Sequence, residues 1–401
     1  MNISVGISTG QDPLAAAKEA AKQAKKNCSG KVDFAFVFSS VDFAKSNVLK
    51  TISDSLEGLP LLGSSSQAII SSLGVFDHGI IIMLVGLPQG AYFNIACVKN
   101  IKQKTPRAAG EELGEKLLYA FKQLPRELAI VLSDGHIDDV SSLVFGLQEK
   151  LGLSFPLAGG CASDALNLSR TYIYYNDELL TDASVALLLG GKLNYSMSSK
   201  HGWKPLGKPR MVTLSKGNIV AEIDGEPAIR LYQQYLASET AELKADLKRI
   251  SMLYPLGIYV PEEEEYLIRN VISIEEKGIL HFHGDVPQGS TVRLMIGTKE
   301  SCFEASRQTA QELKDNLFRS SQTGQGERKK FILVFNSISR YVLLKRDADR
   351  DVRIIKETLE QDIPLIGLYT YGEHASLHSI NYLGKAYFHN QTITVLGIGG
   401  K

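Results

Sequence analysis

The sequence lacks an excess of charge of either sign. Its 401 residues include 44 Lys plus Arg and 44 Asp plus Glu, so the formal net charge is zero at pH 7. Affinity for nucleic acid comes mainly from basic patches that release counterions from the phosphate backbone, and no cluster of Lys and Arg stands out. We therefore expect no nucleic-acid partner.

Cysteine is scarce and unpaired in the sequence. Cys28, Cys97, Cys161 and Cys302 lie far apart with no C-x-x-C pair, which predicts neither a zinc knuckle nor a disulfide framework. His281 and His283 alternate along a probable strand, but a zinc site usually needs three or four convergent ligands. We expect no metal, no cofactor and a reducing cytoplasmic location.

Long apolar runs and targeting signals are missing as well. The longest apolar run, residues 79–87, has nine residues, whereas a membrane-spanning helix needs ~20. The N-terminus has no basic region followed by an apolar core and a cleavage site, so it does not resemble a signal peptide. There is no phosphate-binding G-x-x-x-x-G-K-[ST] motif, which disfavours nucleotide hydrolysis. We expect no association with a membrane.

What the sequence does contain is a repeat. The tetrapeptide Pro-Leu-x-Gly occurs at residues 60–63, 156–159 and 364–367. Each copy follows an apolar, β-branched run and then an amphipathic stretch, which is typical of a strand followed by a helix. Strands and helices alternate on both sides of each copy. This pattern predicts an α/β fold with mixed sheets, built from three related strand-helix-strand-helix-strand units.

The units divide the chain into two expected lobes. Units one and two occupy about residues 1–88 and 89–190 within a first lobe of residues 1–205. The second lobe, residues 206–401, holds a β-rich part at about 206–290 and the third unit at about 291–401.

Three finer expectations follow from the repeat. The third unit begins with a strand at Thr291–Ile296, and its extra residues lengthen a helix. Ser39, Ser133 and Asn336 occupy matching positions at the ends of equivalent strands. Units one and two pack with approximate two-fold symmetry, because duplicated units often pair through the same surface.

Several motifs, in order along the chain, resemble those of one family. They lie at residues 159–164, 199–207, 217–228, 254–257, 371–373 and 388–392. Together they make the sequence similar to the FIST family, whose N-terminal and C-terminal domains occur side by side in signalling proteins. The resemblance covers almost the whole chain.

The resemblance to the FIST family implies a function. It implies a cytoplasmic sensory protein that binds a small ligand, amino acids being a common proposal. We expect this ligand to be a small polar molecule, bound in a cleft between the lobes. FIST domains are often attached to a histidine kinase, cyclase or chemoreceptor. Because two sensory domains use up the 401 residues, the expected partner is a separate signalling protein of one of these kinds.

The segments after the three tetrapeptides are candidates for the ligand site, because ligands of open α/β sheets bind beyond the carboxyl ends of strands. Glycine lets backbone N–H groups approach an anion, small hydroxyl residues complete its shell, and an indole can close a pocket. Tight turns and packing of the lobe junction are the alternative explanation. The candidate ligand-binding residues are Ser64, Ser65, Gly160, Cys161, Ser163, Asp164, His201, Trp203, Tyr371, Glu373, His389 and Asn390.

A competing hypothesis makes the protein an enzyme. Cys161 with His136 as its base would form the nucleophile of a hydrolase or transferase, provided that the pKa of the thiol falls from ~8.5 toward neutrality. The alternative for Cys161 is a small buried apolar side chain, which is the usual fate of a free cysteine. We expect the sensory function and assign no catalytic residue.

Overall fold

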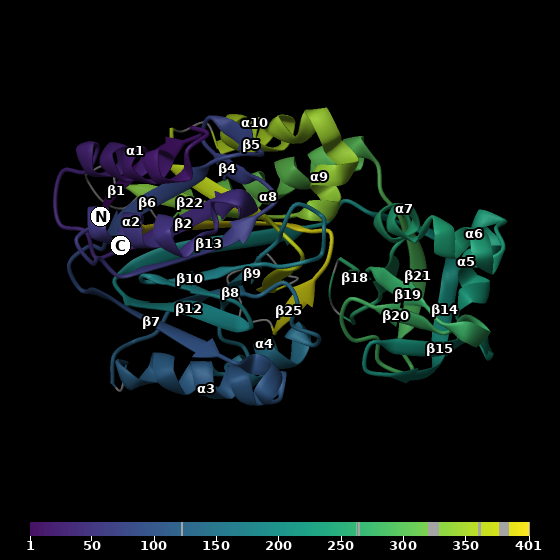
Figure 1. Ribbon diagram of the computed structural model, residues 1–401. Coiled ribbons are helices and arrows are strands. Elements are labelled where there is room, and N and C mark those ends of the chain that lie inside the picture. Colours follow the sequence, from purple (N-terminus) through teal and green to yellow (C-terminus); the bar gives the residue numbers. More distant parts are fainter. Residues whose placement is uncertain are drawn as a thin grey trace.

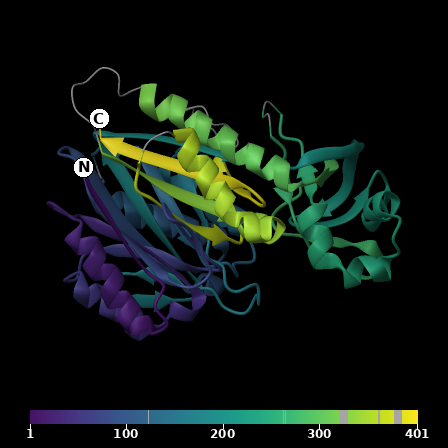
Figure 2. The same ribbon diagram turned by 90° about the horizontal axis from the view of Figure 1, so that it is seen from above.

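The structure is a computed structural model that describes residues 1–121, 123–261, 263, 265–319, 329–359, 362–376 and 385–400. It has a three-unit body and a smaller β-rich domain that projects from one end of the body (Figure 1). Seen from above, the N- and C-termini lie close together at the opposite end of the body (Figure 2). In the described part of the chain, no helix is long and apolar enough to cross a bilayer.

Units one and two have the same order of elements. Unit one comprises β1 (Asn2–Ser8), α1 (Pro13–Lys26), β2 (Phe34–Ser40), α2 (Ser46–Ser55), β3 (Leu61–Ser66), β4 (Ile69–Ser71), β5 (Gly74–Phe76) and β6 (Ile80–Gly86). Unit two comprises β7 (Ala91–Lys99), α3 (Pro106–Tyr119), β8 (Leu128–Ser133), α4 (Val140–Leu151), β9 (Leu157–Cys161), β10 (Ile173–Tyr175), β11 (Glu178–Leu180) and β12 (Ala183–Gly191). Each unit therefore supplies four main strands, two helices and one short hairpin.

Unit three repeats this order around an insertion. It comprises β13 (Leu193–Lys200), α8 (Lys299–Arg319), β22 (Lys330–Ser337), α9 (Ile338–Leu344), α10 (Ala348–Leu359), β23 (Leu365–Thr370), β24 (Glu373–Ser376), β25 (Ala386–His389) and β26 (Ile393–Gly400). The prediction that unit three begins at Thr291–Ile296 is wrong, because β13 pairs with β26 whereas that segment pairs inside the β-rich domain. The extra residues form the separate helix α9 and do not lengthen a single helix.

The β-rich domain is the insertion between β13 and α8. Its elements are β14 (Lys204–Lys216), β15 (Ile219–Ile223), β16 (Glu226–Pro227), α5 (Ile229–Leu236), α6 (Thr240–Ala245), α7 (Leu247–Leu253), β17 (Leu256–Ile258), β18 (Leu267–Arg269), β19 (Val271–Ile274), β20 (Leu280–Phe282) and β21 (Thr291–Ile296). The strands form an eight-stranded sheet with the order β18-β17-β21-β14-β15-β20-β19, with β16 beside β15. It has an apolar core of its own, which Tyr387 of unit three also contacts, and a second apolar cluster joins Ile268 and Met295 to the helices of unit three.

The repeated tetrapeptide has a steric cause. Its glycine lies on the second parallel strand of each unit, opposite a valine of the first. A Cβ on Gly63, Gly159 or Gly367 would lie only 1.7, 1.9 or 2.3 Å from the carbonyl oxygen of that valine. Any side chain would push the two strands apart, so glycine is required three times for the same reason.

The strand registers confirm the predicted equivalence of the units. Ser39, Ser133 and Asn336 each stand opposite the second residue after the tetrapeptide glycine. The α/β class with mixed sheets is confirmed too, since each unit pairs two parallel strands and flanks them with antiparallel ones.

The three units close into a ring by exchanging their hairpins. The β10–β11 hairpin of unit two extends the sheet of unit one, β24–β25 of unit three extends that of unit two, and β4–β5 of unit one extends that of unit three. Each unit thus gives a hairpin to one neighbour and receives one from the other. The predicted two-fold pairing of units one and two is wrong, because the exchange is cyclic and not reciprocal.

The core of the body lies where the three sheets face one another. Apolar side chains of β2, β8 and β22 meet there, with contributions from β6, β12 and β26. Pairs of helices cover the outer faces: α1 and α2 on unit one, α3 and α4 on unit two, and α8 and α10 on unit three (Figure 1). This arrangement directs the carboxyl ends of β3, β9 and β23 toward one central point.

Candidate functional site

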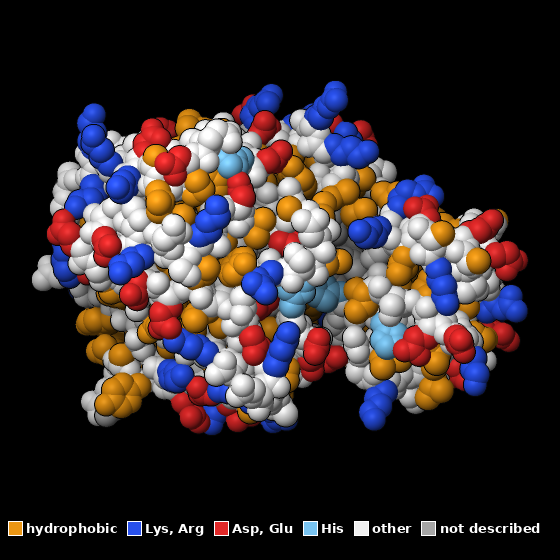
Figure 3. All heavy atoms as spheres, viewed as in Figure 1, with side chains coloured by type: hydrophobic (Ala, Val, Ile, Leu, Met, Phe, Trp, Pro, Cys, Tyr) orange, Lys and Arg blue, Asp and Glu red, His pale blue; other side chains and the backbone are white. Residues whose placement is uncertain are grey.

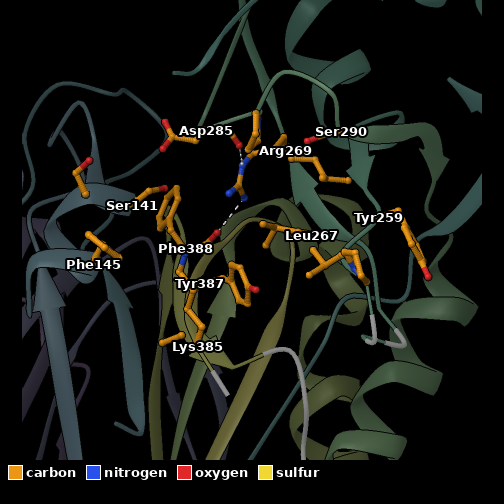
Figure 4. A pocket seen from close by; sticks show the side chains of 16 residues that line it. Ser141, Phe145, Tyr259, Leu267, Arg269, Asp285, Ser290, Lys385, Tyr387 and Phe388 are labelled. Atoms are coloured by element: carbon orange, nitrogen blue, oxygen red, sulfur yellow. Dashed lines mark hydrogen bonds between the residues drawn. The ribbon is translucent and has the colours of Figure 1, made fainter. Parts of the chain in front are cut away.

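A cleft of about 450 Å³ lies between the body and the β-rich domain. Side chains of histidine gather in the hollow between these two parts at the surface (Figure 3). Helix α4 contributes one wall of the cleft, the β25 segment of unit three contributes the floor, and the β-rich domain supplies the remaining sides from β17, β18 and the loop before β21 (Figure 4). The volume falls within the roughly 300–1,000 Å³ typical of small-molecule sites.

Arg269, at the end of β18, points into the middle of the cleft (Figure 4). Its side chain is only 3% exposed. Nε donates a hydrogen bond to the Asp285 carbonyl at 2.8 Å, and Nη1 donates to the carbonyls of Ile268 and Phe388, both at 2.9 Å. Within the described residues, Nη2 has no hydrogen-bond acceptor. Burial lowers the pKa of Arg269 to about 10, so the guanidinium stays charged at neutral pH and keeps one donor group for a ligand.

Asp285 supplies the opposite charge in the same cleft. The half-buried carboxylate accepts no hydrogen bond from any described residue. Burial raises its pKa, the nearby Asp139 raises it further, and attraction to Arg269 and Lys385 offsets these effects only in part. Partial burial without a hydrogen-bond donor disfavours the charged form of this carboxylate, so a cation that entered the cleft would stabilise it.

Helix α4 adds a hydroxyl group to the cleft. The helix begins after Asp139, whose side chain caps it by accepting a hydrogen bond from the Ser142 backbone N–H at 2.9 Å. Ser141 lies in the first turn and lines the cleft. Its Oγ is buried and has no hydrogen-bond partner among the described residues. The cleft therefore combines a cation and an anion, and the unpaired Ser141 hydroxyl is buried in its wall.

The residues predicted from the strand ends do converge, but they do so inside the body. Ser65 Oγ donates to the Ser163 carbonyl at 3.0 Å, and Ser163 Oγ donates to the Tyr369 carbonyl at 2.6 Å. Ser64 and Gly160 lie on β3 and β9 beside them. These hydroxyl groups tie together the three strand ends at the centre of the ring. None of these residues lines the cleft, and a role in ligand binding stays a prediction.

Asp164, Tyr371 and Glu373 are engaged in hydrogen bonds within the body. Tyr371 Oη donates to Asp164, whose carboxylate also accepts from several backbone N–H groups of residues 167–170. Glu373 is fully buried, and burial raises its pKa to about 8. Its carboxyl accepts from Thr370 Oγ1 at 2.5 Å and from Thr392 Oγ1 at 2.6 Å. All three side chains hold loops and hairpins in place, away from the cleft.

The remaining predicted residues lie where the β-rich domain joins the body. Trp203 is buried, and its Nε1 donates to the Met252 carbonyl at 3.1 Å, so this residue packs the junction. His201 Nε2 lies 2.7 Å from Glu265. Asn390 Oδ1 accepts from the Asn270 N–H at 3.1 Å, and His389 is buried on β25. His201 and Asn390 thus connect the body to the β-rich domain, whereas His389 pairs with the Ala375 carbonyl within unit three.

Cys161 has a different imidazole beside it from the one predicted. Its Sγ lies 4.0 Å from His374 Nε2, and no described hydrogen bond joins it to His136. Burial raises the pKa of the Cys161 thiol well above its usual value and lowers that of His374 to about 3. Both groups are therefore neutral at pH 7. Because the thiolate is the reactive form, the neutral Cys161 thiol in this environment is unreactive.

No metal centre emerges from the acidic and sulfur-containing side chains. Across the described residues, no group of three or more His, Cys, Asp or Glu side chains is arranged to hold a metal ion.

Sequence reasoning missed the cleft residues because their segments are far apart along the chain. Ser141, Arg269 and Asp285 come from a helix, a strand end and a loop. Asp285 was considered only as a neighbour of His281 and His283 in a disfavoured metal site, and Arg269 carried a signal as a cation that ends an otherwise apolar strand, Leu267–Arg269.

Comparison with known proteins identifies the family. A model of the FIST N domain matches residues 33–226, and a model of the FIST C domain matches residues 228–376. An uncharacterized protein of Methanocaldococcus jannaschii is 27% identical over 214 residues, which are 48% of this chain and 41% of that protein. An uncharacterized protein of Mycobacterium tuberculosis is 23% identical over 397 residues, covering 94% of this chain and 97% of the other.

A solved structure of a cyanuric acid hydrolase aligns over 100% of this chain and 99% of its own, with a TM-score of 0.37 and 8% identity. Values this low transfer no activity. The family models, by contrast, span most of the chain. The protein belongs to the FIST family, and its FIST N and FIST C domains are sensory domains of signal transduction.

Proposed function

We infer that the protein senses a small zwitterion, such as an amino acid, which binds in the cleft between the body and the β-rich domain. The observation that carries this proposal is the pairing of a buried guanidinium that keeps one donor nitrogen with a half-buried carboxylate that accepts no hydrogen bond. A ligand carboxylate would pair with Arg269 Nη2, and a ligand ammonium would pair with Asp285. Ionic hydrogen bonds of this kind are roughly twice as strong as neutral ones.

The walls of the cleft suggest how binding would be reported. Arg269 and Asp285 belong to the β-rich domain, whereas Ser141 belongs to unit two and Phe388 to unit three. A ligand held by all of them would stabilise one orientation of the β-rich domain relative to the body. A ligand can shift such an equilibrium only by its difference in affinity for the two states.

The family membership supports an output through another protein. We propose a separate signalling protein in the cytoplasm, such as a kinase, a cyclase or a chemoreceptor, as the partner that recognises the liganded orientation.

A calorimetric titration with single amino acids tests the proposal. Asp285→Asn keeps the shape of the side chain and breaks no hydrogen bond to the carboxylate, so this variant should fold and lose at least tenfold in affinity. Asp177→Asn is the matched control, because Asp177 is exposed on the distant β10–β11 hairpin. A ligand at ~100 times its Kd should stabilise the wild-type protein by ~2.7 kcal/mol.

The pH dependence of affinity gives a second test. Because burial raises the pKa of Asp285, its protonation should weaken binding at a higher pH than an ordinary aspartate would. Equal affinities for wild type and Asp285→Asn, or no thermal shift with any amino acid, would contradict the proposed function.

A further inference from the structure

We propose that the ligand of this cleft is an α-amino acid with a large apolar side chain. This inference rests on the proposed function and concerns the part of the cleft that the zwitterionic head group would not fill. It is carried by the separation of charged and apolar groups along the walls.

All the polar groups that the head group would use gather at one end of the cleft. Arg269 and Asp285 lie together there, with the unpaired Ser141 hydroxyl on the facing helix (Figure 4). On the other side of Arg269 from Asp285 lie Leu267 and Tyr387 (Figure 4). A head group bound by the two charges would therefore direct its side chain toward an apolar surface.

The apolar end is continuous across both parts of the protein. The β-rich domain contributes Ile258, Val260 and Leu267, whereas unit three contributes the Tyr387 and Phe388 side chains and helix α4 contributes Phe145. A ligand as small as glycine would leave the apolar end of the cleft exposed to water. Each CH₂ group buried against such a surface increases affinity about fourfold.

One further cation lies at this end, and its surroundings decide against an acidic side chain. Lys385 Nζ is 5.4 Å from the ring centroid of Phe145 and 5.5 Å from that of Tyr387. The ammonium thus already lies over two aromatic faces, which is a favourable contact. A ligand carboxylate would have to draw it away from both rings, whereas an apolar side chain packs beside the same rings without displacing it.

Calorimetric titrations of the full chain with five amino acids test the inference: glycine, L-alanine, L-leucine, L-phenylalanine and L-glutamate. Leucine adds three carbon atoms to alanine, so it should bind roughly fiftyfold more tightly. Phenylalanine should bind at least as tightly as leucine, and glutamate should bind more weakly than leucine.

Two variants examine the apolar end separately from the head-group end. Phe145→Ala should reduce affinity for leucine and phenylalanine at least fivefold and leave affinity for alanine unchanged. Lys385→Met should leave affinity for leucine within threefold of wild type. Melting temperatures of both variants confirm that each one is folded, and the wild-type ranking of ligands does not depend on either variant.

The outcomes separate this inference from the function on which it rests. If glycine, alanine and leucine bind equally, the inference is overturned while a zwitterion sensor remains. If glutamate binds most tightly and Lys385→Met abolishes its binding, the inference is also overturned, because Lys385 then receives an acidic side chain. If no amino acid binds, both proposals fail.

Discussion

The buried carboxyl of Glu373 makes the stability of the protein depend on pH in a direction opposite to that of most carboxylates. The change to test is Glu373→Gln. In the variant, the amide oxygen can accept the two hydrogen bonds that Thr392 donates from its N–H and Oγ1, at 3.1 and 2.6 Å in the wild type. The amide NH₂ can donate to Thr370 Oγ1, which keeps the Asn336 carbonyl as its own acceptor at 3.3 Å. The glutamine is therefore a neutral replacement that satisfies the same neighbours.

The magnitude follows from the pKa of Glu373. Burial raises this pKa from 4.5 to about 8, so the folded protein holds a proton that the unfolded chain releases between these two values. The stabilising contribution is fully present below pH 4.5 and is lost as pH rises through 8. Each pKa unit corresponds to about 1.4 kcal/mol, and the whole loss amounts to about 5 kcal/mol. Glutamine carries no proton to lose, so the variant escapes this change.

Urea denaturation of both proteins at pH 5, 7 and 9 measures the effect. The free energy of unfolding of Glu373→Gln minus that of the wild type should increase with pH and be about 4 kcal/mol larger at pH 9 than at pH 5, because part of the whole loss already lies below pH 5. Other groups titrate equally in both proteins and cancel in the difference. Glu226→Gln, on the exposed strand β16, is the control and should follow the wild-type curve. A difference that stays constant within about 1 kcal/mol from pH 5 to pH 9 would refute the reasoning.

Three further predictions concern packing, reactivity and buried charge. Gly63→Ala should destabilise the protein by about 3 kcal/mol or prevent folding, since the new Cβ would lie 1.7 Å from the Val37 carbonyl oxygen. Gly10→Ala is the control and should change the melting temperature little, because the nearest atom to its Cβ is 3.6 Å away. Equal changes in melting temperature for the two variants would contradict this prediction. Cys161 should resist iodoacetamide at pH 7 in the native protein while the half-buried Cys28 is alkylated, as read by mass spectrometry; rapid labelling of Cys161 would revive the enzyme hypothesis. Arg340→Met should cost roughly 3–5 kcal/mol in urea denaturation because Asp351, 2.9 Å away, is left as an unpaired buried charge. The double change Arg340→Met with Asp351→Leu should recover much of that loss, and no recovery would argue against the charge as the cause.

The sequence was sufficient to predict the units because their local signals agree. The glycine of the tetrapeptide indicates a close approach of two backbones, and the apolar runs before it indicate buried parallel strands. Both signals are local, so each can be recognised in the sequence without knowledge of which distant segments the strand contacts. The α/β class and the matching positions of Ser39, Ser133 and Asn336 followed from them.

The parts that could not be predicted depend on contacts between distant segments. Strand β13 alternates Leu193, Tyr195 and Met197 with polar residues, a pattern that a strand search can find, but 98 residues separate its end at Lys200 from the start of α8 at Lys299. The exchanged hairpins consist of strands of three or four residues. Such short strands do not carry enough sequence pattern to predict which sheet they will join. The cleft could not be predicted either, because Ser141 meets Arg269 and Asp285 only through the position of the insertion.

The cyclic exchange of hairpins determines when the chain can complete its fold during synthesis. The β4–β5 hairpin of unit one pairs with β23, so Ile70 has no strand partner until Gly367 has been synthesised. Units one and two can form their own strands and helices on the ribosome, yet the unit-one hairpin stays an unpaired edge until β23 of unit three has emerged. Such edges invite pairing with other chains, and contacts between residues far apart in sequence form slowly. Closure of the ring is therefore the step at which a nascent chain of this protein is most exposed to aggregation and most dependent on chaperones.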